Sequence, residues 1–313
     1  MTNDINWDLP GIRALIQGAL QEDLGGALLA RSGDHTANAI AAADQAARAR
    51  IVARQNLVLA GMPIVQRVFR ALDAHCVIEA PFGEGASVKS GEVVARASAR
   101  ARAILSGERT ALNFLAHLSG IATLTRQFAD AIEGTRAKIR DTRKTTPLHR
   151  QLEKYAVRMG GGVNHRLGLY DAILIKENHV ALAGSVAEAV RRANEYSIAF
   201  AGGAPEITAY ESFMPEARAS SLSIQVEVRN EAELREALAA GADSVLLDNV
   251  LPMQAVGLIR MVRESRPSCV VEVSGGVRLS NVRAFAEAGA DFIAVGAITH
   301  SAPAADFSLL VDA

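Results

Sequence analysis

Residues 236–249 read EALAAGADSVLLDN, and residues 284–297 read AFAEAGADFIAVGA. Each stretch holds the end of a helical pattern, an Ala-Gly-Ala-Asp turn and an apolar run that ends at a small or polar residue. The second stretch follows the first by 48 residues, so the pair forms a weak internal repeat. Repeated units with continuous rather than alternating apolar runs are typical of parallel strands covered by helices.

The same alternation of strand and helix extends over the second half of the chain. Strands are predicted at residues 137–142, 171–176, 222–228, 243–249, 268–276 and 291–297. Helical spacing separates most of them, at residues 185–196, 230–240, 252–265 and 280–288. Six such strands favour an α/β barrel over an open sheet, although periodicity alone does not distinguish the two.

The first third of the chain has a pattern typical of a small α+β unit. Helices are predicted at residues 9–24 and from Met62, with a loop rich in Gly, Ser and Asp at residues 25–36. Strands are predicted near residues 49–54, 57–61, 76–80 and 92–99. A long helix is predicted over residues 107–134, and Gly120 is a candidate break in it.

The charge balance is close to zero, with 33 Lys and Arg against 34 Asp and Glu. This balance gives no general attraction to nucleic acid or to an anionic membrane. No apolar run approaches the roughly 18 residues of a membrane span, and residues 1–10 do not resemble a secretion signal. The only two cysteines, Cys76 and Cys269, do not have the spacing of metal ligands. So few cysteines are typical of a protein from a reducing compartment. We therefore expect a cytoplasmic protein with no nucleic-acid or membrane partner.

Polar residues gather at the ends of the predicted strands, where the active sites of barrels lie. One group is cationic: Arg143, Lys144, His165, Arg166 and Lys176. Another is acidic and consists of Glu227 and Asp248. The last two strands end in small residues, at Ser274-Gly275-Gly276 and Gly296, which would let backbone N–H groups approach a phosphate. This rim suits a highly anionic ligand, with two carboxylates for a metal or a developing positive charge.

Each of these residues also has an ordinary structural explanation. Arg143 and Lys144 could belong to a solvated loop, and Lys176 could extend from a strand end into solvent. Asp248 could cap the helix that begins near Pro252. Six strand ends that are polar in the same sense would rarely arise by chance, so the group as a whole favours a functional site at the ends of the strands. The chain has no G-x-x-x-x-G-K-S/T and no strand followed by G-x-G-x-x-G, which argues against phosphate binding of the P-loop or Rossmann type.

Several motifs resemble those of the quinolinate phosphoribosyltransferase family. They are RDTRKTTP (140–147), LEKYAVRMGGGVNHRLGLYDAILIKENH (152–179), QVEV (225–228), LLDN (246–249), VSGG (273–276) and VGAITHSAP (295–303). In the first third, EDLG (22–25), IVARQNLVLAG (51–61) and SGERTALNFLAHLSGIAT (106–123) follow in the family's order. The match covers nearly the whole chain, and its longer motifs are specific in combination.

The resemblance implies a fold, a reaction and an assembly. The fold is an N-terminal α/β sandwich domain, residues 1–109, and an open, incomplete α/β barrel, residues 110–300, with the tail 301–313 joining the sandwich. The reaction takes quinolinate and phosphoribosyl pyrophosphate to nicotinate mononucleotide, pyrophosphate and CO₂ in NAD biosynthesis, with Mg²⁺ as the cofactor. The family's homodimers complete each active site with a residue of the partner subunit.

The resemblance also implies a role for each matching residue. The residues expected to bind quinolinate are Arg143, His165, Arg166, Lys176 and, from the partner subunit, Arg109. The residues expected to contact phosphoribosyl pyrophosphate are Lys144, Lys176, Glu227, Asp248, Ser274, Gly275, Gly296 and His300. Within this set the expected catalytic residues are Lys144, Lys176, Glu227 and Asp248. The two carboxylates are also expected to face the hydrated Mg²⁺.

The chain departs from the family pattern in four places, one of which is the region of residues 27–39, where the match is only loose. Residues 197–220 form an insertion where relatives are shorter, and a surface excursion is its simplest explanation, with a lid or an interface element as alternatives. Gln225 stands where Glu is common. Leu148 and His149 follow Pro147 where relatives often have Gly-Leu.

Three other functions are compatible with parts of the sequence. A paralogue with the same fold could act on a different acceptor. Lys176 at a strand end could form a Schiff base, as in aldolases, if it were desolvated. A non-catalytic module could bind a phosphorylated ligand, although Glu227 and Asp248 would weaken such anion binding.

Overall fold

The computed structural model describes residues 5–7, 9–26, 32–201 and 222–312, which form two compact units. The barrel unit contains residues 127–145 and 162–298. The sandwich unit contains residues 5–126, 146–161 and the C-terminal segment from Thr299. No helix of the described residues is both long and apolar enough to cross a bilayer.

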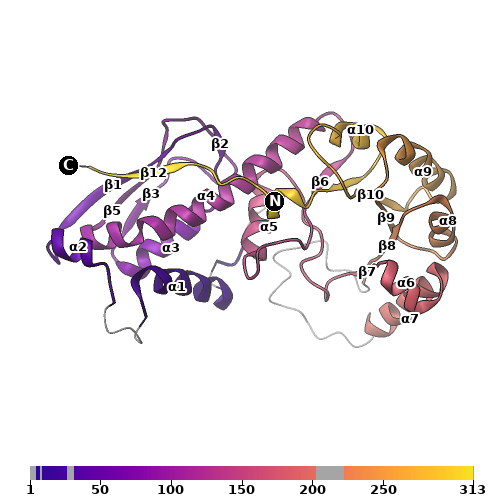
Figure 1. The fold of residues 1–313 in the computed structure, drawn as a ribbon, viewed down its shortest axis with the longest axis horizontal. Helices are drawn as coiled ribbons and strands as arrows, with labels where there is room; N and C mark the ends of the chain where they lie inside the picture. The colour runs from indigo at the N-terminus through magenta and orange to yellow at the C-terminus, as the bar shows by residue number, and fades with distance from the viewer. Residues whose placement is uncertain (1–4, 8, 27–31, 202–221, 313) are drawn as a thin grey trace. The chain divides into compact units, whose positions relative to one another are not determined.

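The barrel unit is built on six parallel strands (Figure 1). Their order in the sheet is β6 (Lys138–Arg140), β11 (Phe292–Ala294), β10 (Val270–Ser274), β9 (Ser244–Asp248), β8 (Ile224–Val228) and β7 (Ile173–Ile175). These are the six predicted strands. Most of their Val, Ile and Leu side chains are buried, with Ile173, Leu174 and Val270 partly exposed, because both faces of a parallel sheet are covered.

Helices connect the strands of this sheet. They are α6 (Glu177–Ala183), α7 (Val186–Ala201), α8 (Glu231–Ala239), α9 (Pro252–Ser265) and α10 (Val282–Glu287), and a further helix, α11 (Ala297–His300), follows the last strand, β11. The side chain of Asn230 accepts a hydrogen bond from Glu233 N and begins α8, and Pro252 occupies the first turn of α9, as helix starts require. Four predicted helices are confirmed, whereas α6 and α11 were not predicted.

The predicted insertion at residues 197–220 begins as a helix. Helix α7 continues past Tyr196 to Ala201, so the first residues of the insertion extend the preceding helix. The rest of the insertion lies outside the described residues.

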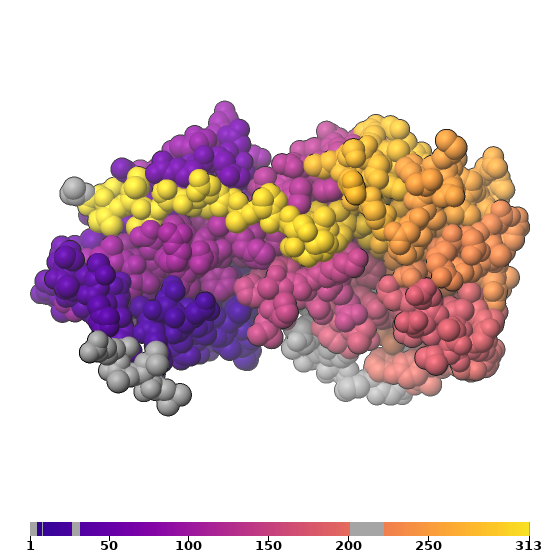
Figure 2. All heavy atoms as spheres, viewed as in Figure 1, coloured from indigo at the N-terminus to yellow at the C-terminus, as the bar shows by residue number. Residues whose placement is uncertain are grey.

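The sandwich unit contains an antiparallel sheet in the order β12 (Phe307–Asp312), β1 (Ala46–Ala53), β5 (Val93–Arg100) and β3 (Val77–Glu79). A two-stranded sheet pairs β2 (Leu57–Val58) with β4 (Ser87–Val88). The helices are α1 (Pro10–Leu24), α2 (His35–Ile40), α3 (Met62–Leu72), α5 (Arg150–Met159) and α4 (Ala101–Ala131), of which residues 127–131 belong to the barrel unit. Figure 2 shows the C-terminal segment, in yellow, lying along the surface of this unit.

The predicted break at Gly120 is wrong, because α4 runs without interruption from Ala101 to Ala131. A Cβ atom at Gly120 would lie 2.1 Å from the carbonyl oxygen of Pro303. The amide of Ala305 also donates a hydrogen bond to Ala116 O at 2.9 Å. The glycine therefore lets the C-terminal segment pass directly over the helix on its way to β12.

Candidate active site

The predicted site residues of the barrel unit lie at one edge of its sheet. Because the six strands are parallel and in register, their carboxyl ends meet at that edge. Glu227 lies in β8, Asp248 ends β9 and Ser274 ends β10. The residues that follow other strands directly or after a few positions are Arg143, Lys144, Lys176 and Gly296.

His165 and Arg166 reach this edge through the buried carboxylate of Asp141. Asp141 follows β6 and is fully buried. Its Oδ1 accepts a hydrogen bond from His165 N at 2.7 Å, and its Oδ2 accepts one from Asn164 Nδ2 at 2.6 Å. A parallel bridge between Arg140 and Val163 leads into the same contact. The motif NHR is therefore held beside the end of β6, although it belongs to no strand or helix.

The guanidinium of Arg166 is in an unusual electrostatic position. The residue is 9% exposed, and its Nη1 donates to the carbonyl oxygen of Ala172 at 3.0 Å. Its Nε is buried with no hydrogen-bond partner among the described residues. Burial and the nearby Arg143 both lower the pKa of Arg166. Two neighbouring cations, one of them buried, favour the binding of an anion that neutralises both.

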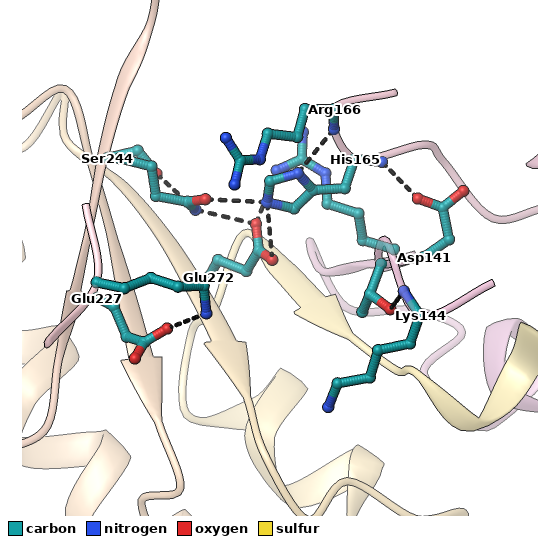
Figure 3. A network of polar contacts seen from close by, with 11 residues as sticks. Asp141, Lys144, His165, Arg166, Glu227, Ser244 and Glu272 are labelled. Atoms are coloured by element: carbon teal, nitrogen blue, oxygen red, sulfur yellow. Dashed lines mark hydrogen bonds and ion pairs between the residues drawn. The ribbon is translucent and has the colours of Figure 1, made fainter. Parts of the chain in front are cut away.

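Opposite charges lie at or near the ends of β7, β8 and β9, and Figure 3 shows one of them, the carboxylate of Glu227, with its ion pair. Lys176 Nζ donates to Glu227 Oε2 at 2.6 Å. Burial, followed by repulsion from Glu227, raises the pKa of Asp248, while Lys176 and Lys144 act in the opposite direction. The four groups thus influence one another electrostatically. The Lys176 side chain is 49% exposed and paired with Glu227, which does not fit the desolvated lysine that a Schiff-base enzyme needs.

The ends of β9 and β10 are held tightly together. Asn249 N donates to Ser274 O at 2.9 Å. Gly275 has φ +86°, and a Cβ atom there would lie 2.3 Å from Asn249 Oδ1. Only glycine fits both conditions. Gly275 therefore lets the turn after β10 lie directly against Asn249. The next residue, Gly276, is exposed with nothing within 4 Å of a Cβ position, so the turn leaves room there for a ligand such as a phosphate.

Three residues of this region escaped the sequence reasoning. Glu272 lies in the middle of β10 and is fully buried. Arg140 Nη1 donates to Glu272 Oε2 at 2.8 Å, and Gln225 Nε2 donates to the same oxygen at 3.1 Å. Gln225 had been noted only as a departure from the family pattern. The available signal was a polar residue within the mostly apolar strands β8 and β10, because a buried polar side chain requires a buried partner.

Two predicted site residues are not brought to the barrel edge by the barrel unit itself. Arg109 is exposed on α4 of the sandwich unit. His300 ends α11, two residues past Ile298, where the barrel unit ends. The face of α4 that includes Asn113 borders a hollow of about 780 Å³ shared with α1 and the start of α5.

The acidic groups suit a metal held mainly by other ligands. No group of three or more His, Cys, Asp or Glu side chains arranged to hold a metal occurs among the described residues. Glu227 and Asp248 offer two carboxylates on adjacent strands. Mg²⁺ is commonly bound in this way, through one or two carboxylates, several waters and the phosphates of a substrate.

The comparisons with known proteins agree with this architecture. Residues 34–119 match the model of the quinolinate phosphoribosyl transferase N-terminal domain, and residues 121–310 match that of the C-terminal domain. A nicotinate-nucleotide pyrophosphorylase (carboxylating) of Mycobacterium leprae is 39% identical over 313 residues, which cover 99% of each chain. A probable enzyme of the same name from Bacillus subtilis is 38% identical, over 95% of this chain and 92% of the relative.

A solved structure extends the agreement to the fold. The crystal structure of NadC from Streptococcus pyogenes superposes with a TM-score of 0.84 at 36% sequence identity, over 99% of both chains. The predicted fold class, an open α/β barrel with an N-terminal sandwich, is confirmed by this likeness and by the two sheets described above. The chain belongs to the quinolinate phosphoribosyltransferase family.

Proposed function

We propose that this chain transfers the phosphoribosyl group of phosphoribosyl pyrophosphate to quinolinate, with loss of CO₂, and so makes nicotinate mononucleotide for NAD biosynthesis. The observation that carries the proposal is the division of charge along one barrel edge. Arg143 is near enough to the buried Arg166 to lower its pKa. Glu227 and Asp248 lie on the adjacent strands β8 and β9. A dianionic acceptor and a reaction centre that becomes positive need these two environments side by side.

The acceptor is assigned to the cationic part of the edge. Quinolinate carries two adjacent carboxylates, and guanidinium groups bind carboxylates through two parallel hydrogen bonds. Arg143 and Arg166 supply the charge, His165 lies next in the chain, and Lys176 completes the set. The unpartnered Nε of Arg166 supports this assignment, because a buried donor without a partner is destabilising unless a ligand satisfies it.

The donor is assigned to the acidic edge and the glycine turn. Its 5′-phosphate would lie against Ser274, Gly275, Gly296 and His300. Lys144 and Lys176 would contact the pyrophosphate, and Glu227 and Asp248 would face the ribose. The same two carboxylates would hold Mg²⁺ through water, and the bound ion would neutralise charge on the departing pyrophosphate.

The residues of the chain would promote the reaction by orientation and charge. The ring nitrogen of quinolinate attacks C1 of the ribose, the bond to pyrophosphate breaks, and the ribose gains positive charge that Glu227 and Asp248 stabilise. The ring nitrogen is then cationic. The bond to the adjacent carboxylate breaks next, its electron pair stays on the ring carbon beside the cationic nitrogen, and a proton from solvent replaces CO₂. No covalent bond to the enzyme forms.

A second copy of the chain would complete each site. Arg109 lies outside the barrel unit and is exposed on α4, so it can reach a neighbouring molecule. Arg109→Ala and Lys176→Ala are each expected to be inactive, yet a mixed dimer should regain activity at one of its two sites. Mixing without recovery, with subunit exchange demonstrated, would contradict this arrangement. The two buried free cysteines support a reducing, cytoplasmic location.

An assay of the purified protein tests the proposed reaction. The mixture contains Mg²⁺, phosphoribosyl pyrophosphate and either quinolinate or nicotinate. Nicotinate mononucleotide with an equal amount of CO₂ from quinolinate, and little product from nicotinate, is the expected result. Product from nicotinate alone, or from neither acid, would contradict the assigned acceptor.

A further inference from the structure

The buried network behind His165 begins at a carboxylate that can only accept hydrogen bonds. Glu272 is fully buried on β10, and a buried carboxylate remains charged when a cation is paired with it. Arg140 on β6 supplies that cation at 2.8 Å. The guanidinium of Arg140 also lies over the ring of Phe292, 3.9 Å from its centroid. Glu272 is therefore a fixed acceptor in the interior of the barrel unit.

Glu272 determines which way the amide of Gln225 points. Gln225 Nε2 lies 3.1 Å from Glu272 Oε2 and 3.2 Å from Ser244 Oγ (Figure 3). The reverse orientation would bring the amide oxygen against the carboxylate, two acceptors at hydrogen-bond distance. The hydroxyl of Ser244 can either donate or accept, so it does not decide the orientation. The amide oxygen of Gln225 consequently faces His165.

The protonation of the His165 ring follows from the hydrogen-bonding capacity of the groups nearest its two ring nitrogens. Nε2 lies 2.9 Å from the amide oxygen of Gln225, which only accepts, so Nε2 carries a hydrogen. Nδ1 lies 2.7 Å from the backbone nitrogen of Arg166, which only donates, so Nδ1 carries none. Both contacts agree on one form of the ring, the neutral imidazole with its proton on Nε2.

We propose that Gln225, anchored by Glu272, is a positioning residue that holds His165 uncharged at the acceptor site. The placement of His165 beside quinolinate rests on the proposed function, whereas its charge state does not. The cationic role predicted for His165 would then fall to the guanidinium and ammonium groups alone. A neutral ring also avoids a third positive charge beside Arg143 and Arg166.

The charged groups around the ring act in both directions. Glu272 Oε1, 3.6 Å from His165 Nε2, and Asp141 at the end of β6 favour a charged ring. Arg140, paired with that glutamate, and the adjacent Arg166 oppose it. Protonation at Nδ1 would in addition break the hydrogen bond from the backbone of Arg166. The proposal therefore rests on the hydrogen-bond directions at Nε2 and Nδ1, and not on a sum of the surrounding charges.

The charge of His165 can be measured directly in the unliganded protein. The chain contains seven histidines, and long-range ¹⁵N–¹H correlation of ¹⁵N-histidine-labelled protein reports the protonation of each ring nitrogen. The His165→Asn variant identifies the signals of His165. At pH 6 an ordinary histidine, with a pKa of about 6.5, is about three-quarters protonated. We expect His165 to show one protonated and one unprotonated nitrogen at pH 6, and an imidazolium or an Nδ1–H ring would overturn the proposal.

A matched pair of variants tests the role of the amide. Gln225→Glu replaces the amide with a second carboxylate, which should raise the proton affinity of His165 by about tenfold or more. Ser244→Ala removes the other partner of the same amide and should leave the His165 signals unchanged. Unchanged signals in Gln225→Glu, or a charged ring in Ser244→Ala, would contradict the assignment to Gln225.

Kinetics separates this inference from the proposed function. In Gln225→Glu the KM for quinolinate should rise about tenfold, because the new negative charge repels a dianion, while kcat changes less. An equal loss of kcat and kcat/KM would indicate general damage and contradict a positioning role. If the wild-type protein does not turn over quinolinate while the spectra agree, the proposed function fails and the charge state of His165 stands.

Discussion

Adding one methyl group at Gly275 should have a much larger effect than adding it at Gly276. Both glycines have positive φ, +86° and +64°, so alanine is strained at either position. A Cβ atom at Gly275 would also lie 2.3 Å from Asn249 Oδ1 and 2.7 Å from Asn249 N, whereas one at Gly276 meets nothing within 4 Å. The two variants share the backbone strain and differ in the collision.

The magnitudes follow from these two terms. A left-handed conformation costs a non-glycine residue about 1–2 kcal/mol, which is the whole expected loss of unfolding free energy in Gly276→Ala. Overpacking adds about 1–3 kcal/mol, so Gly275→Ala should lose about 2–5 kcal/mol. Relief of the collision must displace Asn249, and with it Asp248. We therefore expect the KM for phosphoribosyl pyrophosphate to rise in Gly275→Ala only, by about 5–150-fold, the range that corresponds to 1–3 kcal/mol.

Denaturant unfolding and steady-state kinetics of the two variants provide the test. The KM for quinolinate is the internal control, because its proposed site lies at other strand ends. Equal losses of stability in the two variants would refute the collision argument. A stability difference without a change in the KM for phosphoribosyl pyrophosphate would refute the assignment of this turn to the donor.

Three further predictions concern other parts of the molecule. Gly120→Ala should lower the free energy of unfolding by about 1–3 kcal/mol, because its methyl group would clash with Pro303. Gly18→Ala, at an exposed helical position with free space, should raise it by up to about 1 kcal/mol. If denaturant unfolding gave the same change in free energy for both variants, the argument from the clash would be wrong. Arg166→Lys should raise the KM for quinolinate at least about tenfold, because lysine makes no bidentate contact, and an unchanged KM would place quinolinate elsewhere. Asp248→Asn should abolish turnover yet raise the free energy of unfolding at pH 7. The pKa of Asp248 is raised in the folded protein, so ionisation of this group lowers the stability of the wild-type protein as the pH rises through that pKa. The gain in the variant should disappear below the ordinary pKa of aspartate, and a variant less stable than wild type at pH 7 would contradict this reasoning.

The sequence was sufficient to predict the barrel strands, because continuous apolar runs bounded by turn residues occur in few other settings. It was insufficient for the interior of those strands. Glu272 is flanked by valines, and nothing local indicates that Arg140, 132 residues away, is its partner. The break at Gly120 was predicted from local propensity alone, whereas the glycine is required by a tertiary contact with the C-terminal segment.

The candidate site shows the same division between local pattern and long-range contact. Lys176, Glu227 and Asp248 could be placed because each ends or nearly ends an apolar strand. His165 belongs to no element, and only its motif indicated a role. The hydrogen bond to Asp141 that positions it, and the amide that faces its ring, depend on chain segments that periodicity does not connect.

The pairing of β12 with β1 has a consequence for synthesis in the cell. Arg54 Nε donates a hydrogen bond to Ser308 Oγ, which lies 254 positions later in the chain. The segment between these two residues includes every strand of the barrel unit. At roughly 5–20 residues per second, translation of that interval takes about 13–50 s. Once β5 has been made, β1 can pair with it on one side, but its other edge stays open until β12 is complete, and such an open edge promotes aggregation. Nascent chains that have lost residues 307–312, or that stall before them, should therefore be the forms of this protein that chaperones and proteases recognise first.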